Sequence, residues 1–458
     1  MYRYLIKNLD IIVVSPFIIN FFINLLNEGS TLSSLRVLDI FYGFICFIFL
    51  LSIGNLVSIL FSLNSKTFGV ILYYLSFFAF NYTTLYFDQF FFSFYDYFIL
   101  INILWLLLFI LKRDKFSLFQ FAIPLFIYVC LTLFRDSIED RLTYLVEFKG
   151  DVEYFWFPMT KMIYENDLFY ALVNNIEFGY GLLINHIHSI NYLFFVGGDE
   201  YIFYNSTSNI YIFFSIALIL EQNIKIRHKV LFVALFISIV VNSEWLTYLF
   251  YNSLMGETVV NILFPIIVLR SIGLLNLEKN IDLHIVFLIS FVYLSKPFIS
   301  ILILLVFVVK AFYTKKISYL IVIFSGVIIN LLNYKFVLKL NTSNTYFNST
   351  ELGTLSSILD YEYFNIYLIF ENIFLKDKVL TLILLLFICL FFWRLSSGKV
   401  KTYLPHIIIF INIGLVVGLY ATVWSNRELE SSYRYIFSII TLFILVIGQD
   451  LADVRKKK

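Results

Sequence analysis

Long apolar runs alternate with short polar segments along the whole chain. Runs of about 18 or more apolar residues are typical of transmembrane helices. The period-two alternation of membrane β-barrel strands is absent, so the spans are predicted to be helices. The pattern predicts spans near 10–26, 39–63, 69–87, 95–111, 117–134, 203–222, 230–250, 257–274, 283–295, 298–312, 317–334, 379–393, 404–424 and 434–449. We therefore predict an all-α fold: a polytopic transmembrane helical bundle of about 13–14 spans, forming one domain over residues 1–458.

The composition supports a membrane protein and excludes several other classes. Of the 458 residues, 61% are hydrophobic and 14% are charged, whereas a soluble protein carries roughly a quarter charged residues. The net charge of +2 implies no nucleic-acid partner. Cys46, Cys130 and Cys389 lie inside apolar runs without metal-ligand spacing, which predicts buried thiols.

Basic residues predict the topology. Lys and Arg concentrate in cytoplasmic loops, and here they fall in alternate loops. They occur at Arg3 and Lys7, Lys66, Lys112 to Lys115, Lys225 to Lys229, Lys279, Lys310 to Lys316, Arg394 to Lys401, and Arg455 to Lys458. We predict a multi-pass protein of the cytoplasmic (inner) membrane with both termini in the cytoplasm.

The predicted outer side then holds the loops 135–180, 335–365 and 425–434. Residues 180–197 complicate the count, because this apolar segment contains two Asn and two His. We interpret it as a short, broken or re-entrant helix, which a membrane tolerates where it packs on protein or lines a cavity. His186 and His188 are two residues apart and therefore do not share a helix face, which argues against a metal site.

The loop 135–180 is the most polar stretch near the membrane. Asp151 and Glu153 come directly before Tyr154, Trp156 and Pro158. Carboxylates at a membrane edge are costly to bury and are often functional. Residues 155–171 follow, with apolar side chains on one face. This pattern predicts an interfacial helix that lies along the outer membrane surface and does not cross the bilayer.

The loop resembles the first outer loop of GT-C superfamily integral-membrane glycosyltransferases, particularly the bacterial polyprenyl-phosphate-sugar-dependent type. The resemblance rests on an Asp, a Tyr, then Pro and Lys before an interfacial helix, which leads to Tyr180–Gly181. Glu257 in NSLMGE resembles the second acidic position of the superfamily, and Arg434 in SSYRY resembles its C-terminal Arg-Tyr. The chain departs from the pattern in having Glu at the second acidic position and four additional spans before residue 117.

This resemblance implies a GT-C-like fold with interfacial helices on the outer side. It also implies transfer of a sugar from a polyprenyl phosphate to a glycan, lipid or protein acceptor, in cell-envelope polysaccharide biosynthesis. Such transfer needs a base for the acceptor hydroxyl and cations for the departing phosphate. Asp151 is placed as the base, with Glu153 and Asp140 in reserve and Glu257 as a further catalytic candidate. Lys296, Arg427 and Arg434 are placed as phosphate ligands. We predict no resident metal site, and a divalent cation stays open as a cofactor.

Other interpretations of the same residues stay open. Glu257 is also suited to stabilising a helix dipole, Lys296 to an interfacial position, and Arg434 to an ordinary outer rim. An O-antigen-type polymerase or ligase would favour arginine-rich outer loops, but 335–365 contains two lysines and no arginine. A transporter or flippase of lipid-linked sugars would need charges in mid-span, and the predicted span centres carry almost none.

Overall fold

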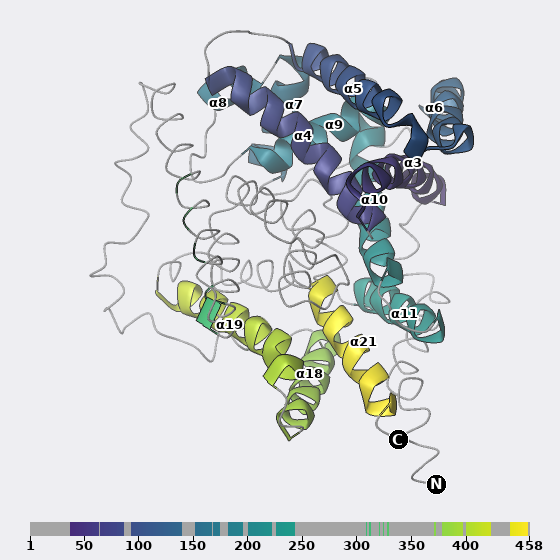
Figure 1. The fold of residues 1–458 in the computed structure, drawn as a ribbon. Helices are drawn as coiled ribbons and strands as arrows, with labels where there is room; N and C mark the ends of the chain where they lie inside the picture. The colour runs from purple at the N-terminus through teal and green to yellow at the C-terminus, as the bar shows by residue number, and fades with distance from the viewer. Residues whose placement is uncertain are drawn as a thin grey trace.

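The structure is a computed structural model of the whole chain, and every continuous element that it describes is a helix (Figure 1). It describes residues 37–63, 65–86, 93–139, 152–166, 168–174, 182–195, 200–221, 226–242, 378–396, 400–422 and 440–456, with isolated positions between 308 and 371. The main helices are α3 (Val37–Phe61), α4 (Lys66–Tyr86), α5 (Phe94–Leu111), α6 (Leu118–Glu139), α7 (Phe157–Glu165), α8 (Leu168–Val173), α9 (Leu183–Phe195), α10 (Glu200–Glu221), α11 (Ile226–Asn242), α18 (Lys378–Ser396), α19 (Val400–Thr422) and α21 (Ile440–Lys456).

Most of the described helices occupy the positions predicted from the apolar runs. Three are long and apolar enough to cross a membrane: Gly43–Phe61 in α3, Phe94–Leu111 in α5 and Lys378–Ser396 in α18. They indicate a membrane protein. The predicted spans near 10–26, 257–274, 283–295, 298–312 and 317–334, and the loop 335–365, lie outside the continuous described ranges.

Helix α4 matches the predicted span 69–87 in position but is less apolar than α3, α5 and α18. Its sequence includes tyrosine, serine, threonine and asparagine side chains. Residues 67–75 of this helix are all buried. Because protein surrounds α4, it does not need the uniformly apolar surface of a lipid-facing helix.

The hairpin between α3 and α4 is closed by small residues. A Cβ atom added at Gly69 would lie 2.0 Å from the carbonyl oxygen of Gly54, so only glycine permits this approach. The Ser58 hydroxyl contacts the carbonyl oxygens of Gly54 and Ser65, each at 2.7 Å. The two helices therefore form one tightly packed unit, on which α6 and α10 pack from the side of α3.

Described residues beside three of the loops predicted to be cytoplasmic lie close together. At the end of α10, Glu221 accepts hydrogen bonds from the Ser65 hydroxyl at 2.5 Å and from the backbone N–H of Thr67 at 2.9 Å. Lys115, after α5, donates to the carbonyl oxygen of Leu60 at 3.5 Å. The turns near 65, 115 and 221 are therefore neighbours, as the alternation of basic loops requires.

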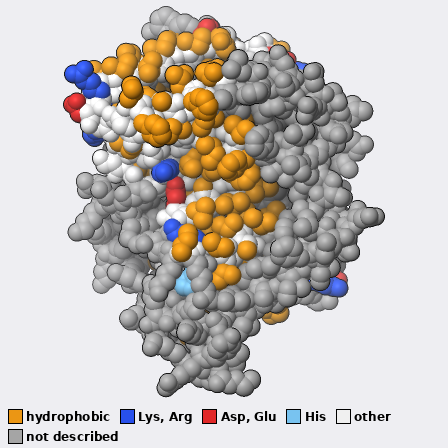
Figure 2. Space-filling model, turned by 90° about the vertical axis from the view of Figure 1, so that its right-hand side faces the viewer, with side chains coloured by type: hydrophobic (Ala, Val, Ile, Leu, Met, Phe, Trp, Pro, Cys, Tyr) orange, Lys and Arg blue, Asp and Glu red, His pale blue; other side chains and the backbone are white. Residues whose placement is uncertain are grey.

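The described helices form an N-terminal group, α3 to α10, and a C-terminal group, α18, α19 and α21 (Figure 1). Helix α11 contacts both, since it packs against α10, α18 and α21. Hydrophobic side chains cover much of the described surface on the side shown in Figure 2. Exposed apolar residues are frequent on α5 and α6, which is expected where helices face lipid.

Candidate functional site

The segment that follows Asp151 is helical and is held against the interior of the protein. A π-helical turn, Val152–Trp156, leads directly into α7. Pro158 lies in the first turn of α7, where a missing backbone N–H has no cost. Helix α7 ends at Glu165, with Asn166 as its C-cap, and α8 begins at Leu168. Glu153 is exposed on the π-helical turn.

The segment predicted to form an interfacial helix is helical, in the π-helical turn, α7 and α8, and its apolar face contacts protein. Phe155, Met159 and Ile163 were expected to lie on the membrane surface, but they are buried, with exposures of 4%, 0% and 0%. This face packs against α9, and Tyr164 stacks on Tyr192 with ring centroids 3.9 Å apart. An apolar helix face has the same sequence pattern whether lipid or another helix covers it, which explains the difference.

The opposite face of this segment is exposed and polar. Lys161 and Glu165 form an exposed (i, i+4) pair at 3.6 Å, and Tyr170 is 47% exposed. The segment is therefore amphipathic as predicted, with its polar face outward and its apolar face on α9.

Side chains of α9 bind the backbone of residues 156–160, which follow Asp151 in the sequence. The Asn185 amide donates to the carbonyl oxygen of Trp156 at 2.8 Å, and the Ser189 hydroxyl donates to the carbonyl oxygen of Thr160 at 3.0 Å. Both residues are fully buried. Carbonyl groups in the first turns of α7 thus receive partners from a different helix, which fixes the position of the chain a few residues after Asp151.

Helix α9 spans 13 residues and lies among α4, α7 and α10 (Figure 1). The sequence predicted a short helix here, and this is confirmed. Residues 182–192 are buried throughout, although they include five polar side chains: Asn185, His186, His188, Ser189 and Asn191. Buried polar groups need partners, and neighbouring helices supply at least one to each of these five side chains.

The two histidines of α9 contact different helices, as their spacing predicted. A ring nitrogen of His186 lies 3.3 Å from the Asn81 amide of α4, while His188 Nδ1 lies 2.8 Å from the Tyr211 hydroxyl of α10. The rings of Phe78 and Phe94 contact His186 edge to face. Burial lowers the pKa of His186 to about 3, so its imidazole is neutral at physiological pH.

A chain of hydrogen bonds continues from His188 through the interior. The Asn191 side-chain amide donates to the Tyr211 hydroxyl at 3.4 Å, and the Tyr74 hydroxyl donates to Asn191 Oδ1. This chain joins α4, α9 and α10. Together with the bonds to Trp156 and Thr160, it makes α9 the connection between the loop segment and the surrounding helices.

Helix α5 begins next to the end of α7. The backbone N–H of Phe94 donates to the carbonyl oxygen of Asn166 at 3.1 Å. Ser93 and Asp96 form a capping box that starts α5 at this point. The end of α7 therefore lies at the opposite end of α5 from the basic turn at Lys112.

Most of the predicted site residues lie outside the described residues. These are Asp151, Asp140, Glu257, Lys296, Arg427 and Arg434. Glu153 is the described member of the set. The predicted grouping of carboxylates and cations at one outward site stays a prediction.

A second buried polar cluster connects the C-terminal helices. Arg394 of α18 contacts Asp450 Oδ1 of α21 through Nε and Nη2, each at 2.5 Å. His406 Nε2 of α19 lies 2.6 Å from Asp450 Oδ2; its angle departs from that of a regular hydrogen bond. Arg394 is 4% exposed, Asp450 2% and His406 0%. We call Arg394, His406 and Asp450 the buried ionic triad.

Sequence reasoning missed this triad. Arg394 and Asp450 each follow an apolar run and were assigned to the ends of spans, where charges normally meet water. The available signal was a His six residues into a helix, at a position where an apolar residue is expected. Within the described helices, no group of three or more His, Cys, Asp or Glu residues is arranged to hold a metal ion.

The chain was compared with family models, curated proteins and solved structures, and none of these comparisons gave a match.

Proposed function

We propose that this protein is a membrane glycosyltransferase that moves a sugar from a polyprenyl-phosphate donor to an acceptor. The transfer takes place on the outer side of the cytoplasmic membrane, with both termini in the cytoplasm. The proposal rests on the resemblance of the loop 135–181 to GT-C enzymes and on the helical membrane character of the chain.

One structural observation carries most weight. The chain directly after Asp151 is anchored by the buried side chains of Asn185 and Ser189. Positioning a base against an acceptor contributes to catalysis only if the surrounding backbone is held firmly.

Under this proposal Asp151 deprotonates the acceptor hydroxyl, which then attacks the anomeric carbon of the donor. The bond from that carbon to the phosphate oxygen breaks, and polyprenyl phosphate leaves. Lys296, Arg427 and Arg434 neutralise the charge on the leaving phosphate. Glu153 and Glu257 are the alternative bases.

The decisive experiment is a transfer assay with purified protein and polyprenyl-phosphate sugars. Asp151→Asn keeps the shape of the side chain and removes the proton acceptor, so transfer should fall roughly 10²–10⁴-fold. Glu165→Gln is the matched control, because Glu165 is an exposed carboxylate of α7 whose partner is Lys161. Full activity of Asp151→Asn with loss in Glu257→Gln would assign the base to Glu257, and inactivity of the wild-type protein toward every donor would count against the proposal.

A second candidate function is a transporter or flippase of lipid-linked sugars. The observation that favours it is the buried ionic triad, because ionisable groups inside a membrane bundle often mark transport pathways. Liposome assays separate the two: a transporter moves a labelled lipid-linked sugar between leaflets with no acceptor present, whereas a transferase releases polyprenyl phosphate only when an acceptor is added.

A further inference from the structure

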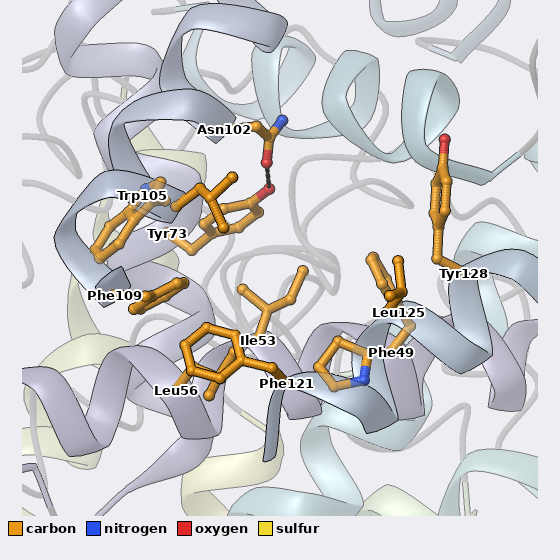
Figure 3. A pocket seen from close by; sticks show the side chains of 12 residues that line it. Phe49, Ile53, Leu56, Tyr73, Asn102, Trp105, Phe109, Phe121, Leu125 and Tyr128 are labelled. Atoms are coloured by element: carbon orange, nitrogen blue, oxygen red, sulfur yellow. Dashed lines mark hydrogen bonds between the residues drawn. The ribbon is translucent and has the colours of Figure 1, made fainter. Parts of the chain in front are cut away.

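Helices α3, α4, α5 and α6 enclose a groove of about 300 Å³ (Figure 3). Its walls are mostly apolar, with Ile53 and Leu56 from α3, Trp105 and Phe109 from α5, and Leu125 from α6. The residues of α5 that line the groove, from Asn102 to Phe109, lie 8 to 15 residues after Phe94, the first residue of this helix. With a rise of about 1.5 Å per residue, it is well separated from the Asp151 segment and independent of the proposed catalytic site.

The polar atoms in the groove wall already have partners. The Tyr73 hydroxyl donates to Asn102 Oδ1 at 2.7 Å, and Asn102 Nδ2 donates to the carbonyl oxygen of Phe98 at 2.8 Å. The Trp105 indole N–H donates to the Ser76 hydroxyl at 2.9 Å. A ligand inside the groove gains little from polar contacts with these groups, so the groove suits a hydrocarbon chain.

The groove opens onto an exposed apolar surface of α5 and α6. Leu106 and Leu125 line it and are 52% and 65% exposed. Their neighbours Leu107 on α5 and Phe126 on α6 are 50% and 69% exposed. Because α5 has the length and hydropathy of a membrane span, lipid chains are the molecules adjacent to this opening.

A basic turn lies at one end of the groove. Lys112, Arg113 and Lys115 are exposed in the connection between α5 and α6, accompanied by one carboxylate, Asp114. The connection is held close to the groove by aromatic contacts: Phe109 lies 5.4 Å from Phe116 between ring centroids. Three cations against one anion give this turn an excess of positive charge.

We propose that the groove and the basic turn together bind an anionic phospholipid. One acyl chain occupies the groove between α5 and α6, and the phosphate of the headgroup contacts Lys112, Arg113 and Lys115. The charge selects an anionic headgroup, since basic residues next to the membrane surface attract acidic lipids. The apolar walls of the groove favour binding of the acyl chain. This is a lipid-binding site in the N-terminal helices, separate from any donor site.

Trp105 provides a direct reporter of an acyl chain in the groove. The full-length protein is reconstituted in vesicles that contain phosphatidylglycerol brominated on its acyl chains, or phosphatidylcholine brominated in the same way. Bromine quenches tryptophan fluorescence on contact. We expect stronger quenching by the brominated anionic lipid, and the excess should disappear in Trp105→Phe, which leaves the other four tryptophans in place.

The headgroup contact is tested by Lys112→Gln, Arg113→Gln and Lys115→Gln combined. In this triple variant the preference for phosphatidylglycerol over phosphatidylcholine should fall by between about tenfold and a hundredfold. Lys378→Gln, a change at an exposed lysine at the start of α18, should leave the preference unchanged. Retention of phosphatidylglycerol by detergent-purified wild-type protein, and its loss from the triple variant, would be seen by native mass spectrometry. Equal quenching by both lipids, or an unchanged preference in the triple variant, would overturn the proposal.

Discussion

The two buried polar clusters of this protein follow different physical rules. Around α9, polar side chains without formal charge pair with backbone carbonyls and with each other, as Asn185 does with Trp156 and Tyr74 does with Asn191. In the C-terminal helices, one carboxylate, Asp450, faces both Arg394 and His406. The first cluster distributes its interactions over several helices, and the second concentrates them on one side chain.

This difference determines how each cluster should respond to mutation. Loss of a neutral hydrogen bond costs about 0.5–1.5 kcal/mol, whereas loss of one partner from a buried ion pair costs about 3–5 kcal/mol because a buried charge is left uncompensated. The α9 cluster should therefore tolerate single changes better than the buried ionic triad.

The largest effect is expected from Asp450→Asn. The substitution keeps the shape of the side chain but removes the negative charge that contacts the Arg394 guanidinium, which is 4% exposed. The free energy of unfolding in mixed micelles should fall by about 3–5 kcal/mol. The paired replacement of Asp450→Leu with Arg394→Met removes both charges and should recover most of this loss.

An exposed ion pair provides the control for this prediction. Glu165→Gln removes one partner of the Lys161 pair, which lies at the surface, and should cost less than about 0.5 kcal/mol. A loss in Asp450→Asn as small as that in Glu165→Gln would show that the triad is hydrated or that Arg394 finds another partner.

The sequence predicted the helices better than it predicted the partners of buried polar side chains. Helix positions followed from the apolar runs, so α3, α5 and α18 were placed within a few residues. The short buried helix α9 was also predictable, because Asn and His in an apolar segment too short to span require protein partners. Those partners come from α4, α7 and α10, more than 20 residues away in most cases, and sequence spacing alone does not reveal them.

The apolar face of α7 and the triad were not predictable for a related reason. The burial of Phe155 and Met159 depends on α9 packing against them, which local amphipathicity does not specify. Arg394, His406 and Asp450 come from three helices and meet only through tertiary packing. Arg394 and Asp450 have ordinary positions near the ends of apolar runs, and His406 alone does not identify its partners.

The titration of His186 is expected to have a smaller effect on the free energy of unfolding. Burial lowers its pKa from the ordinary 6.5 to about 3, so below pH 6.5 the unfolded chain binds a proton that the folded protein does not bind. The free energy of unfolding should therefore fall with decreasing pH, by about 2 kcal/mol between pH 7 and pH 5. Above pH 7, His186 no longer lowers the free energy of unfolding in this way.

The His186→Gln variant isolates this contribution. Glutamine can still hydrogen-bond to Asn81 but does not titrate, so the variant should show a pH dependence weaker by the same amount, while the other histidines contribute equally to both proteins. Equal pH dependence in the two proteins would mean that His186 takes up its proton in the folded state. The buried α9 cluster would then contain a charge, and its contrast with the triad would be lost.

The smallest effect on stability is expected from Asn185→Ala, but this variant tests the link between α9 and the Asp151 segment. The carbonyl oxygen of Trp156 would lose the Asn185 amide and keep the Thr160 hydroxyl at 2.7 Å, so unfolding should become easier by only about 1 kcal/mol. Amide hydrogen exchange in residues 156–163 should nevertheless become faster, since the first turns of α7 lose their anchor. Asn174→Ala is the matched control, because Asn174 is exposed directly after α8 and its side-chain amide donates only to the nearby carbonyl oxygen of Tyr170. If exchange in 156–163 is unchanged in Asn185→Ala, α9 does not hold this segment, and the structural support for a positioned base at Asp151 falls with it.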